Sequence, residues 1–151
     1  MSYNINLQHI VFRTMHGANT IPNCSKHIMF QYIHSVSLRM GVKMLRINAC
    51  LNHIHILVDL PVTQSLPEYV RKIKTTSSTT FQRHSEFPLF TGWASGYGSF
   101  SVSHYEKNHI INYIKGQEEH HRVKTFQEEL ESLFGKDFVE SDPYWRKNWM
   151  D

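Results

Sequence analysis

The sequence Ala49-Cys-Leu-Asn-His-Ile-His-Ile-Leu-Val-Asp59 decides the fold, because it is short, apolar and rich in β-branched residues. Such a composition predicts a β-strand. Side chains alternate across a strand, so His53 and His55 share one face, roughly 7 Å apart at two strand rises. Two imidazoles held on a strand make half of a metal site. In a chain with 11 histidines, two structural histidines explain the pair equally well, so a site needs further groups from elsewhere.

A second stretch, residues 103–117, predicts a helix that supplies such groups. Ser103 and Glu106 match a capping box, S-x-x-E, directly before a periodic apolar segment. Tyr113 and Gln117 are four residues apart, so a phenol hydroxyl and an amide oxygen project from one stripe of the helix. A half-buried tyrosine beside a solvated glutamine is the alternative that this spacing alone leaves open.

Together, the His-x-His strand and the Tyr-x-x-x-Gln helix resemble the single-tyrosine HUH transposases, which include the IS200-like and REP-associated tyrosine transposases. Three segments resemble further motifs of that family, in the same order along the chain. They are K-x-x-S-S at residues 74–78, W-x-x-G-Y-G-x-F-S-x-S at residues 93–103 and Y-I-x-x-Q-x-x-H-H at residues 113–121. The resemblance covers nearly the whole chain.

Two departures from the family pattern affect local geometry. Leu51 and Asn52 stand where the family often has Pro-Asp, directly before the first histidine. Gly116 lies between Tyr113 and Gln117, where it costs about 1 kcal/mol of helix stability relative to alanine. Neither departure removes a chemical group of the expected site.

The resemblance implies an α+β fold, a ferredoxin-like α/β sandwich with a mostly antiparallel sheet and helices packed on it. The order of expected elements agrees with such a fold. The remaining strands are expected at residues 5–13, 42–49 and 99–102, and the remaining helices at residues 24–40, 66–81 and 123–134. The second strand and the histidine strand are expected to form a hairpin. One domain is expected over residues 1–151, with residues 121–151 as a C-terminal helix and tail.

The reaction that the resemblance implies is DNA transposition. Tyr113 would cleave and rejoin single-stranded DNA through a 5′-phosphotyrosine intermediate. His53, His55 and Gln117 would hold a divalent cation, Mg²⁺ or Mn²⁺. Two imidazoles and one amide oxygen leave positions of an octahedral ion open for phosphate oxygens and water. The implied partners are single-stranded DNA with an imperfect hairpin and a second copy of the chain, in a homodimer with active sites shared between subunits.

Residues 66–81 predict a helix in which three cations, Arg71, Lys72 and Lys74, precede a run of hydroxyl side chains. Cations and hydroxyls suit phosphate contacts. Taken by itself, this segment favours a solvated basic face over a DNA contact. With the resemblance, the residues expected to contact DNA are Arg71, Lys74, Ser77 and Ser78.

Residues 83–98 are expected to be irregular, because they contain glycines and a proline among several aromatic residues. Aromatic side chains in such a loop either stack on unpaired bases or form a small core beneath it. For Trp93, the small core is the expected place.

Composition sets wide bounds. With 151 residues, 40% of them hydrophobic and 19% charged, the chain suffices for one core and is not of a disordered type. A net charge of +3 permits a nucleic-acid partner without demanding one. Two cysteines do not make a disulfide framework, and no signal peptide or membrane span is evident. The expectation is a soluble cytoplasmic protein, associated with the nucleoid.

Two other functions stay open at the level of sequence. A catalytically silent or domesticated hairpin-binding protein of the same fold would be expected to have lost at least one of His53, His55, Tyr113 and Gln117. A metal-dependent hydrolase would use water in place of Tyr113, and Tyr113→Phe would then keep its nuclease activity.

Overall fold

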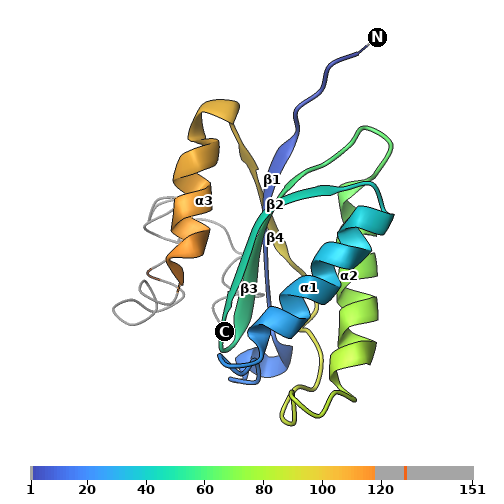
Figure 1. Ribbon diagram of the computed structural model, residues 1–151, viewed down its shortest axis with the longest axis vertical. Coiled ribbons are helices and arrows are strands. Elements are labelled where there is room, and N and C mark those ends of the chain that lie inside the picture. Colours follow the sequence, from blue (N-terminus) through green and yellow to red (C-terminus); the bar gives the residue numbers. More distant parts are fainter. Residues whose placement is uncertain (1, 118–127, 129–151) are drawn as a thin grey trace. The chain divides into compact units, whose positions relative to one another are not determined.

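The computed structural model describes residues 2–117 and residue 128. The chain divides into two compact units, residues 1–115 and residues 116–151. The strands and helices named below belong to the first unit (Figure 1). The expected helix at residues 123–134 and the tail lie outside the described residues, and the single domain over residues 1–151 stays a prediction.

Four strands form an antiparallel sheet in the order β2-β3-β1-β4. Their bounds are Leu7–Arg13 for β1, Lys43–Cys50 for β2, His53–Asp59 for β3 and Gly98–Val102 for β4. β3 therefore lies between β2 and β1, so its backbone is paired on both sides and held rigidly. This sheet, with helices packed on it, confirms the expected α+β fold.

β2 and β3 form the expected hairpin, but β3 begins at His53, four residues after the start of the quoted stretch. Leu51 and Asn52 make the turn instead. Their carbonyl oxygens accept backbone hydrogen bonds of 2.9 Å from residues 14, 20 and 21, so they do not pair within the sheet. The first histidine therefore follows directly on an anchored turn.

Helices cover both faces of the sheet (Figure 1). α1, Lys26–Arg39, and α2, Leu66–Phe81, contact each other on one face, and α3, Lys107–Lys115, lies on the other face against β2 and β3. The longest of them, α2, has 16 residues, and among residues 2–117 no helix has both the length and the hydropathy of a bilayer-spanning segment. The fully buried apolar side chains on the α1 and α2 side of the central strands are Ile10, Phe12, Ile54, Ile56 and Val58.

The helix starts show where local sequence signals hold and where they do not. α2 has the predicted bounds, because Ser65 Oγ accepts a hydrogen bond of 3.2 Å from the backbone N–H of Glu68. The predicted capping box before α3 is wrong. Ser103 Oγ donates to the Glu106 carboxylate over 3.0 Å, and neither side chain caps a backbone group. The chain there makes a 3₁₀ turn, and α3 begins only at Lys107.

Candidate functional site

The two histidines of β3 lie on the sheet face that α3 covers. Both side chains are fully buried, and their ring centroids are 5.1 Å apart, on one face as strand alternation predicts. His53 Nδ1 lies 2.7 Å from Oδ1 of Asn52, and His55 Nδ1 lies 2.9 Å from Nε2 of His9. Because a hydrogen bond engages Nδ1 of each ring, Nε2 is the nitrogen with which either histidine would ligate a metal.

Sequence analysis does not identify His9 or Asn52 as part of this site. His9 is a fully buried residue of β1, and its only local signal is a polar side chain within an apolar strand. Asn52 replaces the aspartate that the family often has before the first histidine. The amide of Asn52 still presents an oxygen to His53, while its Nδ2 donates to the Gly17 carbonyl over 3.4 Å.

Tyr113 projects from α3 toward the histidines. Its ring centroid is 6.0 Å from that of His55 and 6.4 Å from that of His9, and the side chain is half-buried. The buried side chains of Ile110 and Ile114 hold α3 on the sheet, and burial of each contributes roughly 2 kcal/mol. The structure therefore brings the predicted nucleophile and the predicted histidine pair together within one unit.

Asn48 of β2 is a further residue that sequence analysis misses. It is the strand partner of His55, and only 8% of it is exposed. Its Nδ2 donates to the carbonyl oxygens of Ile114 and Lys115 over 2.9 and 3.2 Å, at the C-terminal end of α3 where helix carbonyls lack partners within the helix. Asn48 thereby ties the end of the tyrosine helix to the strand beside the histidines.

The donor set fits a divalent cation. Imidazole rings whose Nδ1 atoms are held by hydrogen bonds are ordinary ligands of such ions. Over the described residues, no three His, Cys, Asp or Glu side chains come together as a metal site, so a third protein ligand would have to be of another type. An amide oxygen meets that need. Gln117 lies in the second unit, and its predicted role as this ligand stays a prediction.

The side chains expected to contact DNA lie on α2, which covers the face of the sheet opposite the histidines (Figure 1). Lys74 Nζ donates to the carbonyl oxygens of Ala94 and Gly96, both over 2.8 Å, and burial lowers the pKa of this lysine. Ser77 is buried and accepts a hydrogen bond of 2.8 Å from Nε1 of Trp93. These two residues hold the loop at residues 93–96 onto α2, whereas Arg71 is exposed and Ser78 is half-buried.

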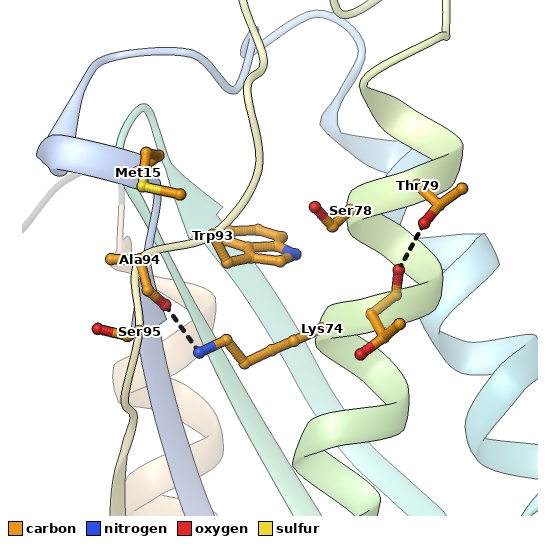
Figure 2. Close-up of a pocket in the computed structure, with 8 residues that line it drawn as sticks. Met15, Lys74, Ser78, Thr79, Trp93, Ala94 and Ser95 are labelled. Atoms are coloured by element: carbon orange, nitrogen blue, oxygen red, sulfur yellow. Dashed lines mark hydrogen bonds between the residues drawn. The ribbon is translucent and has the colours of Figure 1, made fainter.

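A pocket of about 440 Å³ lies between α2 and this loop (Figure 2). Lys74 reaches across it to the Ala94 carbonyl, and Trp93 forms its inner wall. The indole is only 6% exposed and packs edge-on against the Phe12 ring at 4.8 Å, which confirms its expected place in a small core. The lining residues are Met15, Lys74, Thr75, Ser78, Thr79, Trp93, Ala94 and Ser95.

Gly92, directly before this loop, lies close to α2. Its φ is +109°, and a Cβ added there would lie 2.9 Å from the Ser78 hydroxyl. The positive φ favours glycine at this position, and an added Cβ would also displace the Ser78 hydroxyl. The loop is therefore fixed by its backbone as well as by Lys74 and Trp93.

Comparison with known proteins identifies the family. The sequence profile of the family described as Transposase IS200 like matches residues 2–117. The chain belongs to the IS200-like transposase family. It is therefore a transposase, and the matched residues include both histidines of β3, Tyr113 and Gln117. The search of curated proteins gave no significant match.

Two solved structures share the fold of this transposase. One is a candidate transposase from Deinococcus radiodurans R1, with 17% identity and a TM-score of 0.59, over 78% of this chain and 95% of the other. The second is a REP-associated tyrosine transposase bound to a REP hairpin, with 13% identity and a TM-score of 0.62, over 80% of this chain and 72% of the other. At these identities the likeness concerns the fold.

Proposed function

We propose that this transposase cleaves and rejoins single-stranded DNA with Tyr113 as the nucleophile. The observation that carries the proposal is the 6.0 Å separation between the rings of Tyr113 and the buried His55. A tyrosine beside two adjacent imidazoles supports a reaction in which the phosphate enters between the helix and the histidine strand. The tie between Asn48 and the end of α3 keeps the two sides at a fixed separation.

The reaction proceeds by exchange of one phosphate ester for another. The Tyr113 oxygen bonds to phosphorus as the bond from phosphorus to the 3′ oxygen breaks, leaving a 5′-phosphotyrosine, and the departing 3′ oxygen takes up a proton. A tyrosine phenol is a weak nucleophile at neutral pH because it is almost fully protonated. When bound by His53, His55 and Gln117, Mg²⁺ or Mn²⁺ would supply polarisation of the scissile phosphate. A second 3′-OH reverses the exchange, so rejoining needs no ATP.

The proposed DNA partner carries a hairpin, and a protein of the same fold bound to a REP hairpin supports this. Arg71, exposed on α2, and the half-buried Ser78 at the pocket rim are positioned for backbone contacts. Lys74 and Ser77 would act on DNA binding mainly by holding the loop that borders the pocket. A protein with this partner would work at the nucleoid.

We retain the homodimer as part of the proposal. Sharing of active sites between subunits is the family expectation, but the proximity of Tyr113 and His55 in one chain favours a site completed within each subunit. Mixed dimers of Tyr113→Phe and His55→Ala subunits distinguish the two arrangements. Activity near half that of wild type would support sharing, and complete loss would support a site within one subunit.

The function is tested with labelled single-stranded oligonucleotides that span the flanks of the protein's own gene, incubated with Mg²⁺ or Mn²⁺ and run on denaturing gels. Wild type and Tyr105→Phe should form a protease-sensitive adduct on the 3′ fragment, and Tyr113→Phe should form none. Tyr105 is the matched control, because it lies in the 3₁₀ turn directly before α3 and its side chain is 96% exposed. Cleavage that survives in Tyr113→Phe would instead indicate a hydrolase. Tight binding without cleavage of an oligonucleotide that contains the true site would favour a silent hairpin-binding protein.

A further inference from the structure

His9 and His55 form a hydrogen bond between two buried imidazoles on neighbouring strands. In the β1–β3 register His9 is opposite Leu57 and Val11 is opposite His55, so the two histidines are diagonal neighbours on one face. His9 Nε2 and His55 Nδ1 are 2.9 Å apart, and both side chains are fully buried. Such a bond requires an N–H on one ring and a lone pair on the other, so it fixes the tautomers of both rings.

The direction of this bond decides whether His55 is able to bind a metal. If His9 donated, His55 would carry its proton on Nε2, and that nitrogen would have no lone pair for a ligand bond. If His55 donates from Nδ1, its Nε2 presents a lone pair. His9 then accepts through Nε2 and carries its own proton on Nδ1.

We propose that His9 is a positioning residue that accepts the hydrogen bond of His55 and fixes that ring as the Nδ1–H tautomer. Asn52 gives His53 the same tautomer, because an amide oxygen only accepts and lies 2.7 Å from His53 Nδ1. Two different acceptors thereby set both histidines of β3 to present Nε2. The choice of His55 as the donor rests on the proposed function, because only that direction leaves an Nε2 lone pair for a metal, whereas the tautomer of His53 follows from Asn52 alone.

An imidazole suits this buried position better than a carboxylate. The ring of His9 has the rings of Phe100 and Tyr113 as neighbours, each with its centroid at 6.4 Å. A carboxylate acceptor here would bury a negative charge, at a cost of several kcal/mol. A neutral imidazole accepts the hydrogen bond without that cost, and its contact with Tyr113 places one residue beside both the proposed ligand and the proposed nucleophile.

The test combines tautomer detection with metal binding in the full chain. Nitrogen-15 NMR of the metal-free protein, in alkaline buffer where both rings are neutral, should find Nδ1–H tautomers at His55 and His9. Mn²⁺ titration of the protein without DNA should then show an affinity about 10-fold lower for His9→Leu than for wild type. His9→Gln, which keeps an acceptor oxygen near the position of Nε2, should restore the affinity to within about threefold of wild type.

Three results overturn the proposal. The first is an Nε2–H tautomer at His55 in wild type. The second is a folded His9→Leu variant with unchanged Mn²⁺ affinity, and the third is equal loss in the leucine and glutamine variants, which marks a purely structural role. If His9→Leu does not fold, the tautomer in wild type decides. Nδ1–H tautomers in a protein that binds no Mn²⁺ would uphold the assignment and refute the proposed metal site, so the two claims fail separately.

Discussion

Replacement of Asn48 by leucine tests whether one side chain holds the tyrosine helix beside the histidines. The change removes the Nδ2 group that donates to the carbonyl oxygens of Ile114 and Lys115 while keeping a similar volume. It also removes the Oδ1 atom, which accepts hydrogen bonds from Lys26 Nζ and from the backbone N–H of Ala49. Leaving a buried carbonyl without its donor costs about 1–3 kcal/mol. Solvent relieves part of the loss at the helix end, so we expect α3 to lose about 2 kcal/mol of local stability.

Hydrogen exchange measures this loss directly. The amides of residues 110–115 should exchange about 30-fold faster in Asn48→Leu, because 1.4 kcal/mol corresponds to a factor of ten. The strand amides should change much less, except that of Ala49, which donates to Asn48 Oδ1 over 2.9 Å. Asn108→Ala is the matched control, since Asn108 is an exposed residue of the same helix and its loss should cost less than about 0.5 kcal/mol. Exchange in α3 that stays within threefold of wild type would refute the role of Asn48.

Three further predictions concern other parts of the fold. Burial raises the pKa of Tyr69 to about 12, so the free energy of unfolding should fall by about 2 kcal/mol between pH 10 and pH 12. Urea titrations of Tyr69→Phe should lack that part of the fall. The same fall with pH in wild type and in Tyr69→Phe would contradict the prediction. Lys74→Met should lower the Tm by roughly 5 °C and speed proteolysis of the loop at residues 93–96, whereas Lys72→Met, on the exposed side of α2, should do neither. Asn52→Leu should weaken Mn²⁺ binding about 10-fold and Asn52→Asp should not, and equal affinities would exclude a role for the oxygen.

The sign of the Tyr69 prediction follows from proton linkage. Well below pH 10 the tyrosine is protonated in both the folded and the unfolded chain and contributes no pH dependence. Above that pH the unfolded chain loses the proton first, because burial disfavours the charged phenolate in the folded chain. Stability is therefore lost as the pH rises toward 12.

Local signals in the sequence predict those parts of the fold that depend on near neighbours. α2 has its predicted bounds because Ser65 caps it and its apolar residues recur with helical spacing. The shared face of His53 and His55 follows from the geometry of a single strand. The capping box before α3 fails because Ser103 and Glu106 bond to each other, and sequence spacing does not distinguish that pairing from capping.

The remaining parts of the site depend on contacts between distant segments. The bond between His9 and His55 joins residues 46 apart, and the bond from Asn48 to Ile114 joins residues 66 apart. Neither is predictable without the register of the strands and the docking of α3. Lys74 illustrates a different limit: its sequence context suits a phosphate, yet the folded chain supplies two carbonyl oxygens to its ammonium group.

The most direct test of the central claim is to identify by mass spectrometry the residue that carries the DNA after cleavage. Trypsin releases residues 108–115 as one peptide. Of the seven tyrosines of the chain, this peptide contains Tyr113 alone. The account predicts that this peptide gains the mass of a 5′-linked nucleotide phosphate after nuclease trimming, and that Tyr113→Phe yields no adduct. An adduct on a peptide with another tyrosine, or cleaved DNA with no adduct on any peptide, would contradict it.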